Sequence, residues 1–70
     1  MRTKFDTKLT VGQRLRKLRG KRTKVEVAEA IGVSESSYIK YERDERHPSD
    51  PIKKRIAAYF NSNVGDIFFS

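Results

Sequence analysis

Cysteine is absent from this chain of 70 residues, which excludes a disulfide framework and a thiolate zinc site. Long apolar runs are absent too. None approaches the roughly 18 residues of a membrane span, and no apolar stretch follows the basic N-terminus as in a signal peptide. A chain of this length forms one domain and buries only about 60% of the surface that its unfolded form exposes. We therefore expect a soluble, intracellular domain that is stabilised by hydrophobic packing alone.

Catalytic and metal-binding constellations are also missing. His47 is the single histidine, and without cysteine and with only scattered acids it predicts a loop residue, not a metal ligand. The serines at positions 34, 36 and 37 lack a base that a third group would orient, so they do not predict a nucleophilic site. We predict no enzymatic activity, no metal and no cofactor.

Basic residues strongly outnumber acidic residues in this chain. Lysine and arginine number 16 against 9 aspartates and glutamates, a formal net charge of +7, which favours an anionic partner such as nucleic acid. The longest basic segment contains no acid: it holds Arg14, Arg16, Lys17, Arg19, Lys21, Arg22 and Lys24. A basic run alone is equally typical of a solvated helix face, so a second signal must decide between the two.

Hydrophobic spacing predicts where the folded part begins. Residues 1–10 show no helical period and few apolar side chains, and we predict a flexible N-terminal arm over 1–10 and a folded domain over 11–70. A first helix is indicated by apolar residues at i, i+4 and i+7, namely Val11, Leu15 and Leu18, which share one face and leave Arg14, Arg16 and Lys17 elsewhere on the helix. We expect this helix to end near Gly20.

A second and a third helix are joined by a very short turn. Thr23 and Glu26 form a T-x-x-E capping box that starts the second helix, and Gly32 is placed to end it in the left-handed conformation. Its inner face carries Val27, Ala28 and Ile31. Ser34, a favoured N-cap, opens the next helix. Two short helices joined this tightly must cross steeply.

The third helix is expected over Glu35–Arg43. Tyr38 and Tyr41 lie i+4 and i+7 from Ser34 and point inward. Of Tyr38, Tyr41, Tyr59 and Phe60, three fall on inner faces at helical spacing, so we interpret these aromatic residues as core and not as a base-stacking platform. The outward positions are Glu35, Ser36, Ser37, Ile39 and Lys40. A helix, a glycine turn and a second helix is the geometry that places the second helix in a DNA major groove, although other helical hairpins share it.

Two further helices complete an all-α, compact five-helix bundle. Asp50 and Pro51 resemble an N-cap followed by proline at the first helical position, so the fourth helix is expected to start at Pro51. Its inner face carries Ile52, Ile56, Ala57 and Phe60. Asn63, with Asp66 three residues on, predicts a cap for a short fifth helix that contains Val64, Ile67 and Phe68.

These residues resemble a known family. The segment T-K-V-E-V-A-E-A-I-G-V-S-E-S-S-Y-I-K-Y-E-R, the following R-H-P and the terminal V-G-D-I-F-F are similar to the Cro/CI or Xre-type helix-turn-helix transcriptional regulators. The likeness covers Val11 to Phe69 and is greatest to the phage and plasmid repressor-like members of Gram-positive bacteria. It implies a lambda-repressor-like DNA-binding domain with its helix-turn-helix at the second and third helices.

The resemblance also implies which residues contact DNA. Base edges in the groove are assigned to Ser34, Glu35, Ser36, Ser37 and Lys40 of the recognition helix. The DNA backbone is assigned to Lys24, Arg43 and Arg46. Arg19 and Glu42 match a pair that bridges the first and third helices of the family, and we expect them to form a structural ion pair without contacting DNA.

Two residues depart from the family pattern. Asp44 stands where glycine usually ends the third helix; aspartate tolerates the left-handed conformation but brings a negative charge towards DNA. Glu35 occupies a position that often carries arginine or glutamine. It can accept a hydrogen bond from a cytosine amino group or repel phosphate, and the sequence leaves both roles open.

Three functions follow from these observations. The first is a regulator, a repressor, that binds an inverted-repeat operator as a homodimer, with Val64, Phe68 and Phe69 in the dimer surface; it would act in the bacterial cytoplasm at the nucleoid. The second is a protein-interaction module of the same fold that binds another regulator or a toxin, as antirepressors and antitoxins do. The acidic residues Glu35, Asp44 and Glu45 near the expected DNA face favour it. The third is non-specific nucleic-acid binding through the basic segment. None of the three involves a membrane.

Overall fold

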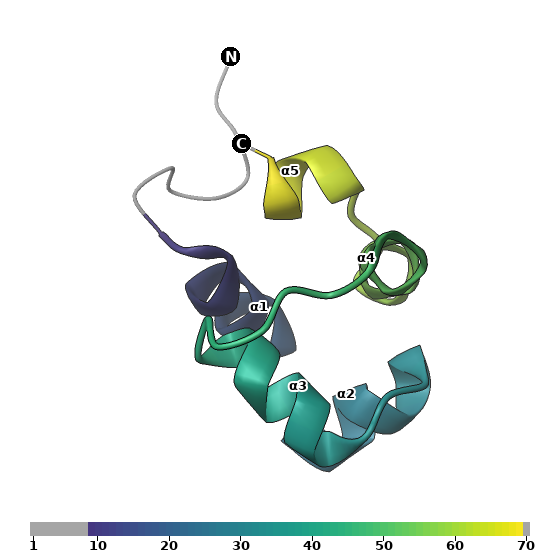
Figure 1. The fold of residues 1–70 in the computed structure, drawn as a ribbon. Helices are drawn as coiled ribbons and strands as arrows, with labels where there is room; N and C mark the ends of the chain where they lie inside the picture. The colour runs from purple at the N-terminus through teal and green to yellow at the C-terminus, as the bar shows by residue number, and fades with distance from the viewer. Residues whose placement is uncertain (1–8, 70) are drawn as a thin grey trace.

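Five helices make up the computed structural model, which describes residues 9–69 (Figure 1). Their bounds are α1 Val11–Arg19, α2 Lys24–Ile31, α3 Glu35–Glu42, α4 Asp50–Tyr59 and α5 Val64–Phe68. No strand is present among the described residues. The predicted all-α, five-helix fold is therefore confirmed, and the helix-turn-helix lies at α2 and α3 as expected.

Each helix packs on two others, and these contacts close into a ring. α1 packs on α3, α3 on α2, α2 on α4, α4 on α5, and α5 again on α1. Figure 1 shows α2 and α3 at one end of the molecule and α5 at the opposite end. Side chains from all five helices fill the ring, and the core residues are Leu15, Val27, Ala28, Ile31, Tyr38, Tyr41, Ile56, Ala57, Phe60 and Ile67.

Local hydrogen bonds fix the helix ends as the sequence predicted. The Thr23 hydroxyl accepts from the Glu26 amide at 3.0 Å and the Glu26 carboxylate accepts from the Thr23 amide, which completes the capping box. Gly32 ends α2 at φ 80°, a left-handed conformation that glycine adopts without steric cost. The Asn63 side chain accepts from the Asp66 amide at 2.8 Å and caps α5.

Two helix boundaries differ from the expectation. Asp50 is the first residue of α4 and Ser49 is its N-cap, without a side-chain cap hydrogen bond, so the prediction of Asp50 as the cap was wrong by one residue. Pro51 accounts for the shift, because its fixed φ suits any position in the first turn. The recognition helix ends at Glu42, and Arg43 is its C-cap.

Thr10, which the sequence analysis placed in the N-terminal arm, is the N-cap of α1. Its hydroxyl accepts from the Gln13 amide at 3.1 Å, and the Gln13 side chain accepts from the Thr10 amide at 2.9 Å. This T-x-x-Q pair is a second capping box. The rest of the predicted arm, apart from Leu9, lies outside the described residues. Within the described part of the chain, no helix is long and apolar enough to cross a membrane.

Candidate nucleic-acid interface

The two faces of α3 differ in burial. Tyr38 is fully buried and Tyr41 nearly so, and both belong to the hydrophobic core. The opposite face exposes Glu35, Ser36 and Lys40 to solvent. The helix therefore presents a short polar surface while its aromatic side chains anchor it, which is the arrangement that major-groove recognition requires.

The N-terminal turn of α3 has its own polar network. The Ser34 hydroxyl caps the helix by accepting from the Ser37 amide at 3.1 Å, and it also donates to the Ser37 hydroxyl at 3.1 Å. Ser37 in turn accepts from the Arg46 guanidinium at 3.2 Å. The structure therefore brings together Arg46, a predicted backbone-binding residue, and Ser37, a predicted groove residue. Ser34 is exposed, whereas Ser37 is half-buried and its hydroxyl is engaged in this network.

The remaining predicted DNA-backbone residues lie at the ends of the helix-turn-helix. Lys24 is the first residue of α2 and is half-buried. Arg43 is exposed beyond α3 and pairs with Glu45 at 3.1 Å, with 66% and 48% of the two side chains exposed. Because this pair is open to solvent it is weak, and the Arg43 guanidinium can exchange Glu45 for a phosphate.

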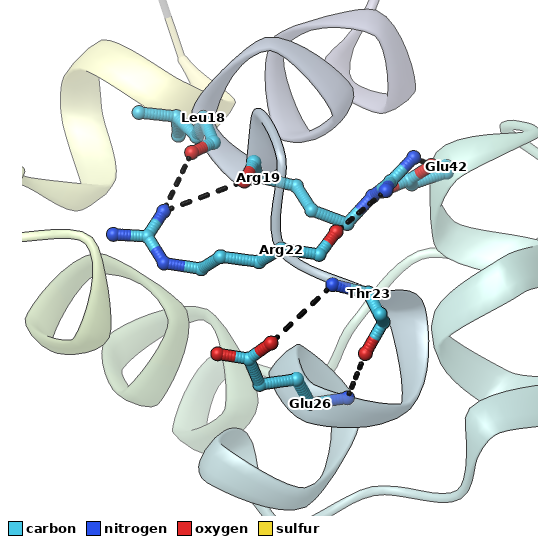
Figure 2. A network of polar contacts seen from close by, with 6 residues as sticks. All are labelled: Leu18, Arg19, Arg22, Thr23, Glu26 and Glu42. Carbon is cyan, nitrogen blue, oxygen red and sulfur yellow. Dashed lines mark hydrogen bonds and ion pairs between the residues drawn. The ribbon is translucent and has the colours of Figure 1, made fainter.

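Arg19 and Glu42 join α1 to α3 (Figure 2). Two guanidinium nitrogens donate to the two carboxylate oxygens at 2.7 and 3.3 Å, and only 15% and 5% of the side chains are exposed. The hydrogen bond to Glu42 raises the pKa of Arg19. Burial raises the pKa of the neighbouring Tyr38 hydroxyl far above its usual value, and Glu42 adds to this effect. The pair is structural, since it lies beneath α3 and not on its outer face.

Arg22 extends this network towards α4, as Figure 2 shows. Its guanidinium donates to the Leu18 carbonyl at 3.0 Å and lies 5.5 and 5.6 Å from the ring centres of Tyr59 and Phe60. Its own carbonyl accepts from Arg19 at 2.8 Å. Arg22 therefore holds the turn before α2 against both α1 and α4.

Arg14 corrects the expectation for the basic segment. Only 4% of it is exposed, and its guanidinium donates to the Ile67 carbonyl at 2.9 Å, at the junction of α1 and α5. Sequence analysis placed Arg14 away from the apolar face of α1. Its position was nevertheless readable, because residue 14 lies between 11 and 18 at helical spacing and so shares their face.

His47 is exposed in the loop before α4, as predicted. Within residues 9–69, no group of three or more histidines, cysteines and acids is arranged to hold a metal ion.

Comparisons with solved structures agree with this geometry. The P22 c2 repressor bound to a synthetic operator superposes with a TM-score of 0.84 at 19% identity, over 87% of this chain and 96% of that chain, and so shows the fold. SinR bound to DNA gives a TM-score of 0.71 at 28% identity, over 79% and 92% of the two chains. SinR is also known in complex with SinI, with a TM-score of 0.77 at 25% identity, over 87% and 62%.

The SOS-response repressor LexA from Eubacterium rectale is similar as well. It has a TM-score of 0.78 and 25% identity over 83% of this chain, and the chain spans 64% of the LexA chain. A search of curated protein sequences gives no match. A family profile described as helix-turn-helix matches residues 13–67, which covers all of α2 to α4 and most of α1 and α5. Family and fold are those of DNA-binding transcription regulators and not of enzymes, and this chain belongs to the Cro/CI-type (Xre) helix-turn-helix family.

Proposed function

We propose that the chain is a sequence-specific transcriptional repressor that binds an inverted-repeat operator in double-stranded DNA as a homodimer. Each copy inserts α3 into one of two major grooves about one helical turn apart, and repression follows from occupying a promoter. The observation that carries the proposal is the exposure of Glu35, Ser36 and Lys40 on a helix whose other face is locked into the core. Such a regulator acts in the bacterial cytoplasm at the nucleoid.

Recognition and affinity are divided between two sets of side chains in this proposal. Base edges are read by Ser34, Glu35, Ser36, Ser37 and Lys40. Phosphates are bound by Lys24, Arg43 and Arg46. A cation on a phosphate carries no direct sequence information, whereas a good groove contact discriminates by about 1 to 3 kcal/mol for each base pair. The exposure of Arg43 and Arg46, next to α3 in the chain, supports this division.

The dimer surface is proposed at the C-terminal end, where apolar side chains gather. Phe69 is 69% exposed, while Val64 and Phe68 are half-buried. The Lys53 ammonium lies 5.5 and 4.9 Å from the ring centres of Phe68 and Phe69, which leaves an aromatic surface edged by a cation. Because this surface is small, self-association is expected to be weak, and sedimentation equilibrium over a range of concentrations tests it.

Selection from a random pool of DNA duplexes tests the proposal directly. The wild-type chain is expected to enrich a sequence with two inverted half-sites, and Ser36→Ala together with Lys40→Ala is expected to abolish the preference for it. Binding to the selected duplex is then titrated with salt, because each phosphate contact adds about 0.9 to the salt slope. Absence of binding to any duplex at low salt contradicts the proposal.

A protein partner is the second candidate, and one observation favours it: the relative SinR forms a complex with SinI. Acidic residues near α3 gave the same indication in the sequence. In the structure, however, the carboxylate of Asp44 is bonded to α1 and that of Glu45 pairs with Arg43. Of Glu35, Asp44 and Glu45, only Glu35 makes no ion pair or side-chain hydrogen bond within the described residues. A chain that binds a protein but no duplex would identify this second function.

A further inference from the structure

The start of α1 differs from the start of every other described helix. The first turns of α2, α3, α4 and α5 each contain an acid, whereas that of α1 has none: the acids are Glu26, Glu35, Asp50 and Asp66. A negative charge at this end of a helix is favourable because the unbonded amides there carry partial positive charge. α1 obtains its acid from a distant part of the chain.

Asp44 supplies that acid. One carboxylate oxygen accepts from the Gly12 amide at 2.9 Å, and the other accepts from the Thr10 hydroxyl at 2.7 Å. Thr10 at the same time caps α1 through the Gln13 amide. Residues 32 and 34 positions apart in the sequence are thus joined by charge-assisted hydrogen bonds.

The backbone of Asp44 belongs to the end of α3. Its amide donates to the Tyr41 carbonyl at 3.2 Å, and its φ of 59° is in the left-handed region. Glycine adopts this conformation at the lowest cost, so the backbone alone does not require aspartate here. The side chain is what aspartate adds, and that side chain contacts α1.

Gly12 shows how closely the two helix ends meet. A Cβ atom at position 12 would lie against the Glu42 carbonyl oxygen, 2.7 Å from the Glu42 carbonyl carbon and 2.8 Å from an Asp44 carboxylate oxygen. The absence of a side chain lets the backbone of α1 rest directly on the last turn of α3. The Asp44 carboxylate therefore binds α1 at the point where the backbones of α1 and α3 are in direct contact.

We propose that Asp44 is a positioning residue for DNA binding: its carboxylate fixes the C-terminal end of α3, and the segment with Arg43 and Arg46, to the start of α1. This inference rests on the proposed function. Groove contacts depend on angstrom-level placement, so a helix held at only one end reads its site less selectively. The partial positive charge at the start of α1 offsets part of the repulsion of DNA that the carboxylate alone would cause.

Two substitutions separate this role from the effect of charge. Asp44→Asn removes the charge and keeps an acceptor for the Gly12 amide, and asparagine also tolerates positive φ. Asp44→Gly suits the backbone conformation but removes the acceptor. The probes are the duplex that the wild-type chain selects from a random pool and a scrambled duplex of the same composition. The main readout is the ratio of the two affinities, in which a general charge effect cancels.

The expected ratio for Asp44→Asn is within about twofold of wild type, and that for Asp44→Gly falls about fivefold, the size of one typical net hydrogen bond. Exchange of the Gly12 amide with solvent is expected to accelerate only in Asp44→Gly. The melting temperature of each variant is measured as well. If Asp44 has only a structural role, Asp44→Gly lowers the melting temperature but leaves the ratio of the two affinities unchanged.

Three results would overturn the inference. They are an unchanged ratio in Asp44→Gly, an unchanged rate of Gly12 amide exchange, and an equal rise in affinity for both duplexes in both variants, which would reduce Asp44 to a repulsive charge. A wild-type chain that selects no sequence contradicts the proposed function itself, whereas a selective wild type with unaffected variants contradicts the Asp44 inference alone.

Discussion

Three arginines of α1 and of the turn after it contact other parts of the protein, whereas the two arginines after α3 are open to solvent. Arg14, Arg19 and Arg22 each have partners within the protein, a carbonyl, a carboxylate or aromatic rings. Arg43 and Arg46 are exposed and form only solvent-open contacts. One residue type thus holds helices together in one region and remains available to a ligand in the other. Net charge alone does not separate the two uses, because it counts both alike.

The largest effect is expected from breaking the internal ion pair. Glu42→Ala should lower the free energy of unfolding by about 3 kcal/mol, because Arg19 is left largely buried without its carboxylate. Glu45→Ala removes the exposed partner of Arg43 and is the matched control, with an expected change below about 0.5 kcal/mol. Thermal unfolding of both variants measures the difference. An unchanged melting temperature for Glu42→Ala contradicts the structural assignment.

The second prediction concerns Arg14, which is buried and bonded within the protein. Arg14→Ala should lower the free energy of unfolding by about 2 kcal/mol, since the Ile67 carbonyl loses a charged donor and α1 loses buried packing against α5. Arg16→Ala, on the exposed side of the same helix, should change it by less than about 0.5 kcal/mol. Urea denaturation compares the two, and equal values would mean that burial of Arg14 contributes nothing.

Lys40 tests the outward face of α3. Lys40→Ala should weaken binding to the selected duplex by about tenfold, which corresponds to about 1.4 kcal/mol, and leave the melting temperature unchanged. Lys54→Ala removes an exposed lysine from α4, a helix that packs on α2 and α5. Gel-shift titration of both variants measures affinity. If the two weaken binding equally, general charge and not the position on α3 is responsible.

The smallest effect is expected from Arg46. Arg46→Ala should reduce the slope of log affinity against log salt concentration by about 0.9, the contribution of one phosphate contact. Lys17→Ala, an exposed cation of α1, should leave the slope unchanged. Titrations at several salt concentrations give both slopes. A drop of the same size for Lys17 would support non-specific binding through the basic segment instead.

Local pairs in the sequence predicted the fold well. The capping box of Thr23 and Glu26, the left-handed Gly32 and the Asn63 cap each involve residues within one turn of each other, so their spacing alone specifies the hydrogen bond. The inward position of Tyr38 followed in the same way from helical periodicity. The ion pair between Arg19 and Glu42 came instead from the family resemblance, and the structure forms it.

Contacts between distant residues were not predictable from spacing. The bonds from Gly12 and Thr10 to Asp44 depend on how α1 crosses α3, and no local pattern reports that crossing. Arg14 is a different case, because its helical position indicated burial while its charge argued for exposure. The capping box of Thr10 and Gln13 was readable but lay in a segment interpreted as an arm. Assignment of the DNA-contacting residues remains a prediction.

The ring of helices makes the two ends of the domain unequal. Thr10 enters α1 beside the last turn of α3, whereas α5 closes the ring at the end opposite α2 and α3 (Figure 1). A protein fused before Thr10 would therefore start next to the recognition helix, and one fused after α5 would start far from it. For engineering, a fusion after α5 leaves the outer face of α3 open but lies beside the proposed dimer surface of Val64, Phe68 and Phe69.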